Sequence, residues 1–338
     1  MTKTDSQPGP ARLSANAALA LGIAFCIAFA LLIALLDPLL PVIAFAPDTG
    51  YAHYFWKLPD PTVWSHATAW TGYLLHQLTI WWLIRTAQVK RPAYTVGLHP
   101  LNVAALAANA FFVLLHLGQT HLSYDGLAQD VPVWSSQASV ILLLVIVLAI
   151  ENQRRGLAFG RRAPLPAEGV RALRKYHGYV FSWAVIYTFW FHPMEATSGH
   201  LLGTVYTALL MLQGSLFFTR VHTNRWWTLT LEVLVLFHGT LVALMQGNGM
   251  WPMFLFGFAA IFVITQMHGL GLSRPIRWAF VAAYAASATF VYGFVRSDWG
   301  AMSEIVRIPV IEYALAFAVA LIAWGLVLLA RRVRRSAA

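Results

Sequence analysis

The chain has 338 residues, of which 59% are hydrophobic and only 11% are charged, and its formal net charge is +10. Soluble domains carry about a quarter charged residues, so this composition excludes a water-soluble globule of the same size. The basic residues stand between apolar stretches instead of forming one basic surface, so we expect no nucleic-acid partner. The only cysteine, Cys26, excludes an intramolecular disulfide and a cysteine-ligated metal cluster.

Apolar stretches of about 20 residues recur along the whole chain, and this is the length that a helix needs to cross a lipid bilayer. Their long unbroken runs do not alternate as the strands of a barrel would, and a lipid-exposed backbone must satisfy its own hydrogen bonds. We therefore predict an all-α, polytopic membrane helix bundle with about ten transmembrane helices. The predicted spans are 17–37, 63–86, 100–122, 134–152, 176–192, 199–220, 226–246, 251–270, 277–296 and 309–330.

The first apolar run, 17–36, is longer than the core of a usual signal peptide, and no clear small-x-small cleavage site follows it. We interpret this run as the first span. Residues 1–16 then form a cytoplasmic N-terminal tail, residues 17–330 form a single transmembrane domain, and residues 331–338 form a basic cytoplasmic tail.

The distribution of Lys and Arg predicts that both termini lie on the cytoplasmic side. With this orientation, 20 of the 23 basic residues lie in cytoplasmic segments, as the positive-inside rule requires. The outer connection 38–62 is rich in proline and aromatic residues and is expected to cover the outer face. The inner connection 153–175 is strongly basic and is expected to lie near anionic headgroups. We expect a multi-pass protein of the cell membrane, namely the inner membrane of a bacterium.

Histidine is the most informative residue type, because ionisable side chains inside a membrane are costly and often functional. The chain has 12 histidines. The densest stretch is the short outer connection between the fifth and sixth spans, which contains His192, Glu195 and His200. Thr197 or Ser198 can cap the following helix. Two imidazoles and a carboxylate are therefore expected at one depth.

This composition predicts a site for a transition metal with nitrogen and oxygen ligands, such as iron, copper or zinc. Two further histidines at the outer end of the third span add ligands if the third, fifth and sixth spans meet. The predicted metal ligands are thus His116, His121, His192, Glu195 and His200. The alternative is that these side chains lie at a wet interface and bind water.

A second interpretation is b-type haem held between histidines on neighbouring helices. His177 and His192 lie 15 residues apart on the predicted fifth span, which is about 22 Å along a helix and would place one haem near each surface. Their partners would be His200 or His116 on the outer side and His222 or His268 on the inner side. The predicted haem ligands are His177, His192, His200 and His222.

Other functional classes stay open. Glu232 is the acid that we place deep in a span, and with His238 and His76 it is a candidate proton relay in a carrier for a small solute, ion or lipid. Glu232 and His238 face different directions on one helix, so we do not expect a direct bond. The remaining alternative is a non-catalytic assembly subunit with a membrane or periplasmic partner protein. The leading hypothesis is a membrane oxidoreductase or electron-transfer subunit with its metal or haem near the outer face.

Overall fold

The structure is a computed structural model that describes residues 13–50, 53–247 and 249–336. These residues form ten α-helices, several short 3-10 or π segments and no β-strand, so the predicted all-α fold is confirmed for this part of the chain. Residues 1–12 and 337–338 of the two predicted tails lie outside the described residues. The helices are α1 (Ala15–Leu36), α2 (Val63–Lys90), α3 (Pro100–Ser123), α4 (Val133–Arg155), α5 (Ala167–Phe191), α6 (Ser198–Ser215), α7 (Arg225–Met245), α8 (Trp251–Ile264), α9 (Arg274–Phe290) and α10 (Arg307–Ser336).

Seven of the described helical segments are long and apolar enough to cross a membrane, and they contain α1, α3, α4, α7, α8, α9 and α10. This finding agrees with a multi-pass membrane protein. α2, α5 and α6 are more polar, and each packs against two or more other helices, where polar side chains are tolerated better than toward lipid. α5 begins at Ala167, well before the predicted start at 176, and α10 continues through the predicted basic tail as far as Ser336.

Side-chain caps define where two of these helices begin. Thr62 and Ser65 form a capping box at the start of α2. The Thr197 hydroxyl accepts a hydrogen bond from His200 N–H at the start of α6 (3.3 Å). Such caps satisfy backbone donors that the first turn of a helix leaves unpaired. The cap of α6 also determines where His200, a predicted site residue, lies.

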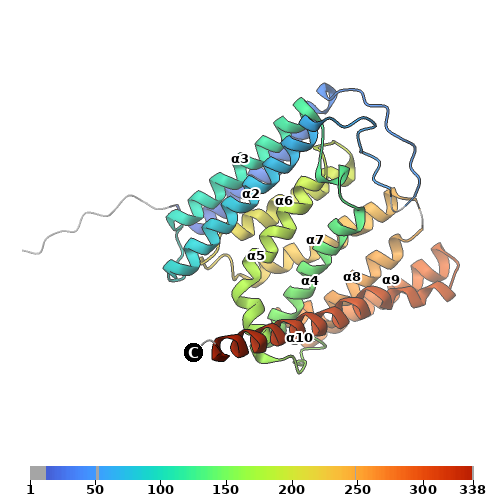
Figure 1. Ribbon diagram of the computed structural model, residues 1–338. Helices are drawn as coiled ribbons and strands as arrows, with labels where there is room; N and C mark the ends of the chain where they lie inside the picture. The colour runs from blue at the N-terminus through green and yellow to red at the C-terminus, as the bar shows by residue number, and fades with distance from the viewer. Residues whose placement is uncertain (1–12, 51–52, 248, 337–338) are drawn as a thin grey trace, which may run out of the picture.

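α5 lies at the centre of the bundle (Figure 1). α2 and α3 pack together on one side of it, and α6 packs against α1, α3, α5 and α7. On the other side α8 contacts α7, α9 and α10. α5 itself contacts α2, α4, α6 and α10, so it joins the two sides and helices from both surround it.

The connections 37–62, 124–132 and 192–197 lie together at one end of the bundle. We call this the acidic end, because these connections contain several acids: Asp37, Asp48, Asp60, Asp125, Asp130 and Glu195. Ala196 N–H donates a hydrogen bond to the Asp37 carboxylate (2.7 Å), and Leu58 N–H donates to Gln129 Oε1 (2.9 Å). These connections are the ones that the distribution of Lys and Arg assigns to the outer side.

The connections 91–99, 156–166, 216–224 and 265–273 lie at the opposite end, together with residues 13–14, and we call this the basic end. Leu98 N–H donates to Leu13 O (3.2 Å), and Thr95 N–H donates to Phe218 O (3.1 Å). From residues 13–14 to the connection 216–224, successive connections thus alternate between the two ends. The direction of the bundle in the membrane stays a prediction.

Trp190 is the largest fully buried side chain and belongs to the apolar cluster that joins α2, α3 and α5. Gly72 in α2 makes room for it, because a Cβ atom at Gly72 would lie only 2.2 Å from the indole ring. On the α3 side, His116 stacks on the indole with ring centres 4.1 Å apart. Three helices therefore meet at one side chain.

We predict that Gly72→Ala lowers the free energy of unfolding by about 1–3 kcal/mol, because the added methyl group overpacks the Trp190 site. Gly118→Ala is the matched control, since no atom lies within 4 Å of a Cβ at this exposed position in α3. The control should be neutral or slightly stabilising, because Ala favours a helix interior over Gly. Thermal unfolding in detergent measures both variants, and equal stability of the two would contradict the packing described here.

Candidate functional site

Three side chains from separate parts of the chain converge at the acidic end. The Tyr54 hydroxyl lies 2.7 Å from His192 Nδ1 and 3.2 Å from His200 Nε2. His192 directly follows α5, His200 lies in the first turn of α6, and Tyr54 belongs to the connection 37–62. The centres of the two imidazole rings are 5.1 Å apart. The structure therefore joins two of the predicted metal ligands and adds a tyrosine that was not predicted.

Neighbouring side chains hold this Tyr54 cluster in place. Thr197 Oγ1 lies 2.8 Å from His200 Nδ1, so the second ring nitrogen of His200 also has a partner. The Trp56 ring packs edge-on against His200 with ring centres 4.3 Å apart. Burial raises the pKa of the Tyr54 phenol well above its usual range, and the nearby Glu195 carboxylate raises it further. A protonated phenol can donate to one imidazole and accept from the other.

Glu195, another predicted metal ligand, bonds to a different tyrosine. The Tyr124 hydroxyl donates a hydrogen bond to Glu195 Oε1. Burial raises the pKa of Glu195, the Tyr124 hydrogen bond opposes this shift, and the neighbouring Asp37 carboxylate adds to it. Glu195 thus lies beside the Tyr54 cluster and does not bond to a histidine in it.

The other two predicted metal ligands have partners elsewhere. His116 Nε2 donates to the backbone oxygen of His192 (2.8 Å). The ring of His121 lies against the backbone oxygens of Leu117 and Leu36 (2.9 and 3.2 Å). Among the described residues, no group of three or more His, Cys, Asp or Glu side chains is placed to hold a metal ion. The five predicted ligands therefore do not form one set, and the histidine pair beside Tyr54 is what the structure brings together.

A chain of buried polar groups runs from His116 into the bundle. The indole of Trp190, which stacks on His116, donates its N–H to His76 Nδ1 (3.2 Å). His76 Nε2 donates to Asn109 Oδ1, and Asn109 Nδ2 donates to Ser215 Oγ, both at 2.8 Å. Because His76 Nδ1 accepts and its Nε2 donates, the ring is the neutral tautomer with the proton on Nε2. Each group in this chain therefore has a partner.

The residues of the predicted proton relay lie apart. His76 belongs to the chain of polar groups beside Trp190, whose indole N–H donates a hydrogen bond but cannot accept a proton in exchange. His238 packs close to Gly203, and its Nδ1 has no hydrogen-bond partner among the described residues. The structure does not bring His76, His238 and Glu232 together.

Glu232 instead forms a buried ion pair that was not predicted. Arg155 Nη1 and Nη2 donate to the two carboxylate oxygens of Glu232 at 3.0 and 2.7 Å, and Gln266 Nε2 donates to Oε2 at 3.1 Å. Arg155 is 3% exposed, although the sequence suggested that it belongs to the exposed basic connection after the fourth span. A bidentate, charge-assisted pair is strong, so Glu232 is a poor candidate for a group that exchanges protons.

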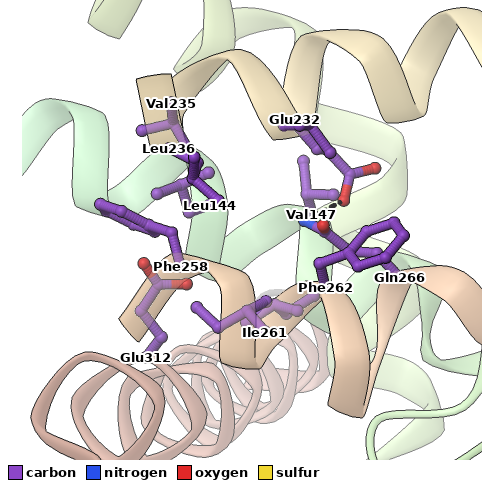
Figure 2. A pocket seen from close by; sticks show the side chains of 12 residues that line it. Leu144, Val147, Glu232, Val235, Leu236, Phe258, Ile261, Phe262, Gln266 and Glu312 are labelled. Atoms are coloured by element: carbon purple, nitrogen blue, oxygen red, sulfur yellow. Dashed lines mark hydrogen bonds between the residues drawn. The ribbon is translucent and has the colours of Figure 1, made fainter. Parts of the chain in front are cut away.

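A second buried acid, near the start of the predicted span 309–330, was not predicted as a site residue. Glu312 in α10 is 3% exposed, and it forms no hydrogen bond or ion pair with any residue that the structure describes. Glu232, Gln266 and Glu312 line one narrow cavity together with apolar side chains from α4, α7 and α8 (Figure 2). This cavity is the second candidate site.

A second pair of histidines lies at the basic end. His177 in α5 and His222 after α6 have ring centres 6.4 Å apart. His177 Nδ1 lies 2.7 Å from Arg174 O, and His222 Nδ1 lies 2.9 Å from Gln213 O. Because a carbonyl oxygen only accepts, each neutral ring carries its proton on Nδ1 and keeps the Nε2 lone pair for a ligand. The four predicted haem ligands thus lie as two pairs, one at each end of the bundle.

Three residues of these sites were not predicted, and their signals in the sequence differ. Glu312 was detectable, because it is an acid inside a predicted span. Tyr54 gave a weak signal as one of many aromatic residues in the connection that is expected to cover the outer face. Arg155 gave none, because it stands beside exposed arginines and its partner is distant in the sequence.

We predict that Glu232→Gln lowers the free energy of unfolding by about 3–5 kcal/mol, because it leaves Arg155 buried and unpaired. The double variant Arg155→Met with Glu232→Leu should recover most of this loss, since both charges are then removed. Glu151→Gln, which breaks the more exposed pair with Arg154, is the control and should cost less than about 1 kcal/mol. Denaturant unfolding in detergent measures all three, and a Glu232→Gln variant as stable as the control would contradict the buried pair.

Comparisons with known proteins do not assign the chain to a family. No family model matches it, and neither the curated proteins nor the solved structures gave a significant match. The features that bear on its function are therefore the Tyr54 cluster, the histidine pair at the basic end and the cavity beside Glu312.

Proposed function

We propose that this chain is a multi-pass membrane protein that binds one transition metal between Tyr54, His192 and His200 and uses it as an oxidoreductase or electron-transfer subunit. The observation that supports this proposal is the convergence of one phenol oxygen and two imidazole nitrogens on one point at the acidic end. Nitrogen and oxygen ligands of this kind suit iron, copper and zinc. A redox function requires iron or copper.

The distances within the Tyr54 cluster are compatible with a shared metal. Ligand atoms at about 2.0–2.2 Å from one metal are about 2.8–3.6 Å apart when the bond angles are about 90–109°. The Tyr54 oxygen lies 2.7 and 3.2 Å from the two ring nitrogens, which is close to this range. The Thr197 hydroxyl at His200 Nδ1 also resembles the outer hydrogen bonds that orient metal-bound histidines. The competing interpretation is a metal-free hydrogen-bonded triad.

Metal analysis of the purified full-length protein tests the proposal. Wild-type protein from metal-replete cells should carry about one equivalent of iron or copper, and His192→Ala or His200→Ala should weaken metal binding more than about tenfold. His66→Ala is the matched control, because His66 lies at the same end but pairs with Asp130, and it should leave the metal content unchanged. Equal metal content in the double His192→Ala, His200→Ala variant and the wild type would reject the site. Zinc alone would reject the redox function.

The haem alternative has support of its own at the basic end. Two axial imidazoles on one haem iron, with iron–nitrogen bonds of about 2.0 Å, have ring centres about 6 Å apart. His177 and His222 lie 6.4 Å apart by this measure, whereas the His192 and His200 rings are closer and have Tyr54 between them. An absorption spectrum of the same preparation distinguishes the two cofactors, because only haem gives an intense Soret band. That band should disappear in His222→Ala if this pair holds the haem.

We further propose that all ten helices cross the membrane, with both termini in the cytoplasm and the acidic end outside. The basic end contains 156–166, with Arg161 and Arg162, and the end of α10, with four arginines from Arg331 to Arg335. Such an excess marks cytoplasmic segments. We include the less apolar helices α2, α5 and α6 among the ten spans, because the connections on either side of each lie at opposite ends of the bundle.

Cysteine labelling tests this orientation directly, because the sole native cysteine, Cys26, is buried. Asp60→Cys places a thiol in the exposed connection at the acidic end, and Arg162→Cys places one at the basic end. A membrane-impermeant maleimide should label Asp60→Cys in intact cells and should label Arg162→Cys only after permeabilisation. The reverse pattern would overturn the orientation. Labelling of both thiols from outside would place the two positions on the same side of the membrane, which an odd number of spans between them does not allow.

A further inference from the structure

Glu312 stands out because it is a buried acid without a partner. Its side chain extends from α10 toward a cavity that α4, α7 and α8 enclose, and Glu232 and Gln266 lie on another side of the same cavity (Figure 2). The cavity has a volume of about 10 Å³, which is close to the minimum for one water molecule. A small ion fits into this space, and an organic solute does not.

The charges around the cavity do not cancel. Arg155 neutralises Glu232 through the bidentate pair, which leaves the Glu312 carboxyl group as the one uncompensated charge when it is ionised. The other ionisable groups near Glu312 are the phenols of Tyr206 and Tyr313, which are neutral, and α8 presents apolar side chains to the cavity. An isolated carboxylate in such surroundings is costly. The site therefore requires one positive charge.

We propose that this cavity binds a single monovalent positive charge at Glu312, either a proton on its carboxyl group or a Na⁺-sized ion held by its carboxylate. Carboxylate oxygens suit hard cations. A divalent ion would leave an excess positive charge in the interior, so the charge balance favours a monovalent one. The site is separate from the Tyr54 cluster and does not depend on the metal proposal.

Purified full-length protein in detergent tests this site. Thermal unfolding is measured while Na⁺ replaces choline at constant ionic strength, and infrared spectroscopy detects a protonated carboxyl group in the same protein. If the site binds Na⁺, the midpoint should rise by about 2–4 °C for each tenfold increase in concentration above Kd, and Glu312→Gln should abolish the rise. If the site binds a proton, the midpoint is insensitive to Na⁺ and Glu312→Gln removes the infrared signal of a protonated carboxyl group.

Glu304→Gln is the matched control, because Glu304 is also buried but already has Arg296 and Tyr292 as partners. It should keep the Na⁺ response or the infrared signal of the wild type. Glu312→Asp retains the carboxyl group and replaces Glu312→Gln if that variant does not fold; it should keep the response with a changed affinity. The proposal would be overturned if the unfolding midpoint of the wild type does not change with Na⁺ and if the infrared spectrum shows no protonated carboxyl signal that is lost in Glu312→Gln.

Discussion

The contact of Trp190 with its surroundings is the interaction on which the rest of the structure depends. The indole needs Gly72 beside it in α2, stacks on His116 in α3 and donates to His76. α5 is therefore held by two neighbouring helices just before it ends, and His116 also donates to the backbone of His192. The position of the Tyr54 cluster thus follows from packing deeper in the bundle, because the histidine that follows α5 cannot shift independently of the indole.

The charged side chains that are buried among the described residues follow one rule with one exception. They find partners within the bundle, as the bidentate bonds between Arg155 and Glu232 illustrate. Such a pair contributes little net stability compared with apolar side chains of the same size, but losing one member is costly. Glu312 departs from the rule. A departure of this kind in a membrane interior is typical of residues that bind ions or protons.

The sequence predicted the all-helical fold and the long apolar segments of a membrane protein, because apolar length acts locally along the chain. It also predicted that His192 and His200 would lie at one depth, since a short connection joins the ends of α5 and α6. It did not predict which neighbours the other histidines face. His116 lies near His192, and its Nε2 donates to the backbone oxygen of His192. Tyr54 and Arg155 were missed because their roles depend on partners far away in the sequence.

The position of the Trp190 indole affects whether protons can pass through the bundle. His116 is hydrogen-bonded to the backbone of His192 at the acidic end and stacks on Trp190. From Trp190, hydrogen bonds lead through His76 and Asn109 to Ser215, where α6 ends. A continuous chain of polar groups across a bilayer would let protons leak and so reduce the membrane potential, if every group could pass a proton onward. The Trp190 N–H cannot pass a proton onward, and it interrupts the chain of polar groups at a fully buried position. The bundle can therefore keep a polar interior and still insulate the membrane in which it lies.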